Sequence, residues 1–181
     1  MSLTKISNNS LSAISTLPAS IPTGALTLLS TQTASSSASI EFTSGIDSTY
    51  DSYIIKIINC HPSGDYTLGF QGSTDGGSTY GVSITSTFFY SYHNEADNST
   101  GLFYNAGLDL ANGTGQQFLN DSVGSDNDLH CCGTFQIFNP SSSTFVKHWI
   151  STQQAGNTGG GSNPYSVNSY AAGYFNSTSP I

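Results

Sequence analysis

A polar segment near the middle of the chain, YHNEADNST, brings together side chains that carry protons in enzymes. His93, Glu95 and Asp97 lie within five positions of one another, and imidazole and carboxylate groups are the usual general acids and bases. Neighbouring positions in a loop do not by themselves supply catalytic geometry. We therefore interpret the segment as a polar loop that follows a strand, and we expect no catalytic residue. A glycan depolymerase that uses Glu95 and Asp97 is the least favoured hypothesis.

A second group of chemically capable residues follows about thirty positions later, where Asp126, Asp128 and His130 precede Cys131 and Cys132. Alternating carboxylates on a loop can hold a calcium ion together with backbone carbonyls, but the EF-hand pattern is absent. Asp126 and Asp128 are weak cation candidates. The favoured interpretation is a solvated loop that leads into a strand, with no metal and no cofactor.

The cysteine pattern and the first residues bear on where the chain is made. Cys60, Cys131 and Cys132 match neither a disulfide framework nor a zinc-ligand spacing. They predict free thiols, mostly buried, in a reducing cytosol. The opening SLTKISNNSL lacks the basic and apolar regions of a secretory signal, and no apolar run is long enough to cross a membrane. We expect synthesis in the cytoplasm and no membrane insertion.

Composition excludes several classes of partner. Only 8% of the 181 residues are charged, against about 25% in an average globular protein. The net charge is -8, and the basic residues are three lysines without any arginine. Phosphate backbones and anionic lipids require clustered Lys and Arg, so nucleic acid and anionic membranes are excluded. The absence of Arg also disfavours phosphoryl transfer and sialic-acid chemistry.

Aromatic residues suggest an alternative binding function. The chain has 10 Tyr, and exposed aromatic rings can stack on sugars. A carbohydrate-binding, lectin-like module is therefore the second hypothesis, although no tyrosine can be singled out from the sequence. The segment from Ser73 to Tyr80, STDGGSTY, resembles the Asp-box turn of sialidase propellers. In those enzymes the box is a structural turn remote from catalysis, and we predict a hairpin turn here.

Hydrophobic alternation predicts an all-β fold. Its most distinctive segment is residues 53–58, which are apolar on both faces and predict a central strand that is covered on both sides. The pattern breaks down between residues 93 and 127, where we expect long loops with short strands. With about eight to ten strands, the chain fits an antiparallel, jelly-roll-like β-sandwich. The other predicted strands are residues 25–29, 38–42, 66–71, 80–92, 129–138, 144–151 and 167–175.

The N-terminal segment differs from the rest. Residues 1–24 carry sparse apolar side chains in a Ser/Asn background, and Pro18 and Pro22 prevent a continuous helix. Two interpretations stay open, a flexible leader and an arm that docks on a neighbouring subunit, and the regular recurrence of apolar positions favours the arm. We predict an anchoring arm over residues 1–24 and a sandwich domain over 25–181. The predicted interface residues of the arm are Leu3, Ile6, Leu11, Ile14, Leu17 and Ile21.

Four stretches carry a resemblance to a known family: the block STQTASSSASIEFTSGIDSTYDSYIIKIINCHPS, and the segments YHNEAD, IFNPSSSTFVKHWIS and AAGYFNSTS. They resemble a family of virion proteins of tailed bacteriophages common in aquatic and cyanobacterial phages. The resemblance implies a non-enzymatic β-sandwich on the exterior of the particle, as a tail-fibre or adhesin subunit or a capsid decoration or cement subunit. It further implies a homotrimer. We expect the protein to contact other virion proteins, to reach the virion surface after assembly in the host cytoplasm, and to take part in host attachment through a host-surface glycan.

Overall fold

The computed structural model describes residues 26–158 and 163–181. The predicted arm and its interface residues Leu3, Ile6, Leu11, Ile14, Leu17 and Ile21 lie outside these residues. Contacts divide the chain into two units, Met1–Thr33 and Ala34–Ile181. In the first unit, residues 26–33 form neither helix nor strand, so the strand predicted at 25–29 is absent from its described part. The eight strands all belong to the second unit.

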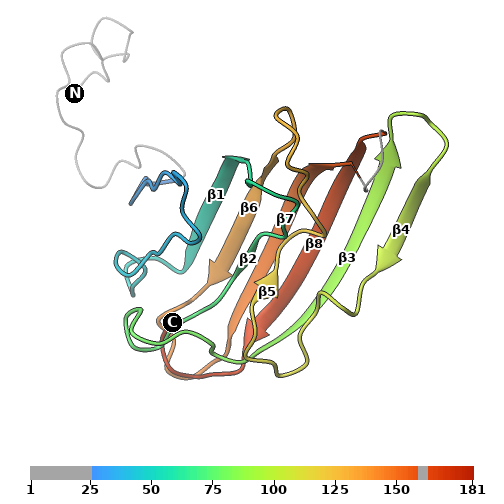
Figure 1. Cartoon of the computed structure of the whole chain (residues 1–181). Coiled ribbons are helices and arrows are strands. Elements are labelled where there is room, and N and C mark those ends of the chain that lie inside the picture. The colour runs from blue at the N-terminus through green and yellow to red at the C-terminus, as the bar shows by residue number, and fades with distance from the viewer. Residues whose placement is uncertain (1–25, 159–162) are drawn as a thin grey trace, which may run out of the picture. The chain divides into compact units, whose positions relative to one another are not determined.

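The second unit is all-β and antiparallel, as the sequence predicts (Figure 1). Six strands form one sheet in the order β1-β6-β7-β8-β3-β4, and two short strands, β2 and β5, form a second sheet. No helix among the described residues has the length and apolarity needed to cross a membrane. The strands are β1 (Ser52–Cys60), β2 (Gly69–Phe70), β3 (Ile84–Asn94), β4 (Thr100–Tyr104), β5 (Gln117–Phe118), β6 (Cys131–Phe138), β7 (Lys147–Asn157) and β8 (Tyr165–Phe175).

Alternation along β7 shows how the sequence builds the large sheet. Lys147, Trp149 and Ser151 are buried, whereas His148 and Ile150 between them are exposed. Side chains of successive strand residues point to opposite faces, so β7 presents one buried and one exposed face. β6 and β7 pair as an antiparallel hairpin, with Phe135 opposite Ser151 and Ile137 opposite Trp149.

The two-stranded sheet covers one face of the large sheet, which we call the inner face. Phe70 of β2 packs its ring against Phe135, Trp149 and Phe175, with ring centroids 4.5, 5.0 and 5.9 Å away. In Figure 1 the small sheet accordingly lies in front of the large one. The core between the two layers contains Tyr53, Ile84, Phe88, Leu119, Phe135, Ile137, Trp149, Ala171 and Phe175. We call the opposite side of the large sheet its outer face.

Two predictions about the region before residue 60 are wrong. Residues 38–42 form no strand, because an alternating segment becomes a strand only where a partner strand is available. β1 is at the edge of the sheet and not in its centre. Its inner side chain Tyr53 is buried, but Ile54 is 39% and Ile58 is 72% exposed, so the second apolar side of β1 has no cover from the described part of the chain.

The predicted turn after β2 is organised by Asp75. Its Oδ1 accepts hydrogen bonds from Ser73 Oγ at 2.6 Å and from the backbone N–H of Thr79 at 2.8 Å. These bonds hold the pKa of Asp75 at about 2. The loop closes where the N–H groups of Gly81 and Val82 donate to the carbonyl of Gly72. It is not a hairpin, because β2 pairs with β5 whereas β3 pairs with β4 and β8.

Candidate functional site

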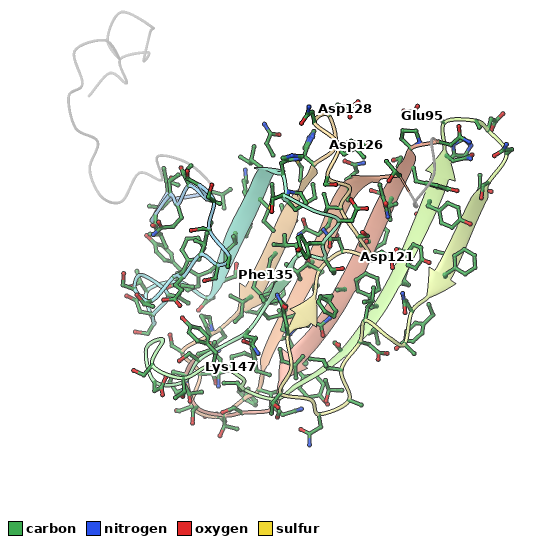
Figure 2. All side chains as sticks on the ribbon, viewed as in Figure 1. Glu95, Asp121, Asp126, Asp128, Phe135 and Lys147 are labelled. Atoms are coloured by element: carbon green, nitrogen blue, oxygen red, sulfur yellow. The ribbon has the colours of Figure 1, made fainter. Side chains whose placement is uncertain are left out.

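The acid/base candidates form one exposed pair and one separate carboxylate. His93 Nε2 lies 3.0 Å from Asp97 Oδ1, and the two side chains are 53% and 91% exposed. Glu95 follows the end of β3, where its backbone N–H donates to the carbonyl of Pro164. Figure 2 shows Glu95 at the end of the sheet, well away from the labelled carboxylate Asp121. A hydrated His–Asp pair in a loop offers neither an enclosed substrate site nor a second carboxylate opposite it.

The cation candidates Asp126 and Asp128 lie in the loop before β6 and are exposed (Figure 2). The backbone carbonyl of Asp126 accepts a hydrogen bond from the N–H of Leu129 at 2.8 Å, which closes the loop as a turn. Across residues 26–158 and 163–181, no group of three or more His, Cys, Asp or Glu side chains is placed to hold a metal ion. The structure therefore does not assemble these residues into a coordination site.

The three cysteines are free thiols. Cys60 of β1 lies directly opposite Cys131 of β6. A hydrogen bond between the two sulfur groups lowers the pKa of Cys60, with a further contribution from the charge of His61. The same bond, together with burial, raises the pKa of Cys131. The pair thus combines a half-buried thiol whose pKa is lowered with a buried thiol whose pKa is raised.

Lys147, at the start of β7, is a fully buried cation. Its Nζ donates a hydrogen bond to the carbonyl of Ser177 at 3.2 Å, and burial lowers its pKa. This bond connects β7 to the segment that follows β8. Its role is structural, since it fixes the C-terminal segment against the end of the sheet shown in Figure 2.

The outer face of the large sheet has no covering layer from residues 34–158 or 163–181. Strand alternation and the pairing register place on it a set of apolar and aromatic side chains from all six strands. Several are markedly exposed, including Ile150 at 52% and Leu102 at 70%. The set consists of Ile54, Ile58, Phe89, Leu102, Tyr104, Phe138, Ile150, Tyr170, Ala172 and Tyr174.

A shallow depression lies near the centre of the outer face. Phe89 and Tyr170 are paired across β3 and β8, and their rings stack with centroids 5.0 Å apart. Next to them the small side chain of Ala172 leaves a hollow of about 200 Å³, lined also by Ile150 and Thr152. The lining is almost entirely apolar. The hollow can receive one apolar or aromatic side chain from another molecule.

Charge is distributed very unevenly between this face and the loops. All 11 acidic residues lie outside the eight strands. Two lysines lie in the eight strands. Strand alternation places Lys56 of β1 on the outer face, whereas Lys147 of β7 points inward. The net charge of -8 is therefore carried by the loops and rims of the domain. The outer face itself is close to neutral.

Sequence reasoning did not identify this face, although a signal for it was present. Residues 53–58 are apolar on both sides, and we predicted that both sides would be covered. Within residues 34–158 and 163–181, cover exists for the inner side alone. Comparison of the chain with protein-family models, with curated proteins and with solved structures finds no match.

Proposed function

We propose that this protein is a non-enzymatic structural protein of a bacteriophage virion exterior, and that its outer face is the surface through which its copies associate. The position would be that of a tail-fibre or adhesin subunit, or of a capsid decoration or cement subunit. The observation that carries the proposal is the broad, nearly neutral and partly apolar outer face. The virion setting rests on the resemblance of the sequence to tailed-phage virion proteins.

Exposed apolar area supports an assembly function. Soluble monomers rarely expose large contiguous apolar patches, and larger patches mark interaction surfaces. Here Ile54, Ile150 and Tyr170 are 39%, 52% and 38% exposed, on three different strands of one sheet. The aromatic content of the face is also typical of the buried centre of protein interfaces. Association would cover the outer side of β1. Both sides of β1 would then be covered, as its sequence predicts.

Electrostatics favours a second copy of this chain as the occupant. Two copies that each carry a net charge of -8 repel one another. The repulsion is smallest when the outer faces meet, because every carboxylate then stays at the rim in water. Each hollow beside Ala172 can also accept an apolar side chain from the facing sheet. We expect a closed homo-oligomer, a homotrimer by the resemblance, located on the virion surface after assembly in the host cytoplasm.

The test introduces one carboxylate at the centre of the outer face. The intact protein and the variant Ile150→Asp are compared by size-exclusion chromatography with multi-angle light scattering over a concentration series. We expect the intact chain to be oligomeric and the variant to be monomeric, because an unpaired charge buried in an apolar interface is strongly unfavourable. Circular dichroism verifies that the variant is folded.

The matched control is Asn127→Asp, which adds the same charge in the exposed loop before β6. This variant should stay oligomeric. An intact chain that is monomeric at every concentration would refute association through the outer face. Equal dissociation of both variants would show that net charge controls assembly, and that result would also contradict the proposal.

A further inference from the structure

A second exposed aromatic area lies on the inner face, beyond the part that the small sheet covers. Tyr90 and Tyr92 of β3 point to this side with Phe103 of β4 and Tyr165 of β8. The ring planes of Tyr92 and Phe103 differ by 6°, with centroids 5.8 Å apart. Tyr165 meets Tyr92 edge-on, at 5.4 Å and 76°. We call the cluster of Tyr90, Tyr92 and Phe103 the aromatic floor. Tyr165 contacts this cluster through Tyr92.

The position of the Phe103 ring depends on the glycine two residues before it. Its ring lies over Gly101, so closely that a Cβ atom at Gly101 would overlap it. Phe103 is 47% exposed. Gly101 also lies directly opposite Tyr92 in the β3–β4 ladder. The missing side chain at Gly101 is thus the reason that two aromatic rings can lie side by side on this surface.

Polar groups border the aromatic floor on the side of the core. Tyr90, Tyr92 and Tyr165 line a depression of about 190 Å³ together with Asp121, Asn157 and Val167. Asp121 is held in place through its backbone, whose N–H donates to Ser169 Oγ at 3.2 Å and whose carbonyl accepts from Thr67 Oγ1 at 3.0 Å. Its carboxylate accepts a hydrogen bond from Asn105 Nδ2 at 3.2 Å. Figure 2 places Asp121 in front of the large sheet, over β8 and β3.

We propose that this depression, together with the ring of Phe103 that lies beside Tyr90 and Tyr92, is a binding site for one ring of a neutral saccharide. The C–H face of a pyranose packs on an aromatic face, whose negative quadrupole attracts the weakly positive C–H groups. The hydroxyl groups at the edge of the same ring donate hydrogen bonds to a carboxylate, and such charge-assisted bonds are strong and directional. Tyr92 and Phe103 provide the first kind of contact, and Asp121 provides the second.

Charge selects the class of saccharide. Asp121 is the charged residue of the depression, and the chain has no arginine that could pair with an acidic sugar. A carboxylate or sulfate on the ligand would meet like charge, so acidic saccharides are disfavoured.

This inference is independent of association through the outer face, because the saccharide site lies on the opposite side of the large sheet. The test presents the full-length protein to a panel of immobilised oligosaccharides with neutral, acidic and amino-sugar termini. The best neutral binder is then titrated in solution by isothermal titration calorimetry. We expect binding within the neutral group, and a loss of about tenfold in affinity for each of Phe103→Ala and Asp121→Asn, as for one aromatic contact or one charge-assisted hydrogen bond.

Phe145→Ala is the matched control, since Phe145 is 69% exposed and lies between β6 and β7. It should bind like the intact chain. Light scattering should show the same oligomeric state for all three variants, which separates this proposal from that of the outer face. No binding of any neutral saccharide, a preference for acidic or amino sugars, or neutral binding that Phe103→Ala and Asp121→Asn leave unchanged would each overturn the proposal.

Discussion

Phe89 and Tyr170 are stacked on the outer face of the large sheet, with ring centroids 5.0 Å apart and ring planes that differ by 13°. They come from β3 and β8 and occupy directly opposite positions in the ladder. Phe89 is 41% and Tyr170 is 38% exposed, so both rings contact each other and remain partly accessible. The pair therefore stabilises the domain and also shapes the surface that we assign to assembly.

A double-mutant cycle measures how much the contact between Phe89 and Tyr170 contributes to the stability of a single chain. We expect Phe89→Ala and Tyr170→Ala to be coupled by about 0.5–1 kcal/mol in the free energy of unfolding, the range for cross-strand aromatic pairs. Urea unfolding should be performed in the Ile150→Asp background, where dissociation of an oligomer does not contribute. Additive effects of the two substitutions would contradict the stacking geometry.

Deletion of residues 1–24 tests the predicted anchoring arm. The hydrophobic core belongs to residues 34–181, so we expect the shortened chain to fold with unchanged circular dichroism. We also expect it to be lost from purified virions when it replaces the full-length protein during phage growth, as measured by mass spectrometry of the particles. Normal incorporation would show that the first 24 residues are not an anchor, whereas failure to fold would refute the domain boundary.

The Asp75 turn predicts a defined pH dependence. The pKa of Asp75 is lowered from 3.8 to about 2, first by its hydrogen bond from Ser73 and then by those from Thr79. A depressed carboxyl pKa stabilises the folded state above the unfolded-state value, and this contribution is lost as the pH falls through the folded-state value. We expect Asp75→Asn to lower the thermal midpoint at neutral pH, and the difference to shrink between pH 3.8 and about 2. A difference that does not vary with pH would contradict this role.

The cysteine pair predicts selective alkylation. Because the hydrogen bond from Cys131 lowers the pKa of Cys60, the Cys60 thiolate should react with iodoacetamide at neutral pH well before the buried Cys131. Chymotryptic peptides should be analysed by mass spectrometry, since the chain has only three Lys and no Arg. In Cys131→Ala the pH midpoint of the Cys60 reaction should rise. An unchanged midpoint would mean that the thiol–thiol bond does not control Cys60.

Much of the fold follows from alternation that is visible in the sequence. β6 and β8 lie at or near their predicted positions, whereas β7 begins inside the predicted segment 144–151 and extends to Asn157. Burial alternates along β7, with Trp149 inward and Ile150 outward. Such segments are predictable because period-two burial is a local property of the chain. The short strands β4 and β5 fall within residues 93–127, where the sequence predicts short strands between loops without fixing their positions.

The binding surfaces could not be identified in this way. The sequence singled out no tyrosine and did not point to Asp121, because the saccharide site combines Tyr90, Phe103, Asp121 and Tyr165 from distant parts of the chain. Likewise, the apolar character of residues 53–58 was evident, but the position of β1 at the edge of the sheet was not. Alternation of apolar and polar residues along the chain is enough to assign the all-β class. The neighbouring strands, the face that the small sheet covers and the aromatic rings that meet are visible only in the folded protein, because they depend on pairing between residues far apart in the chain.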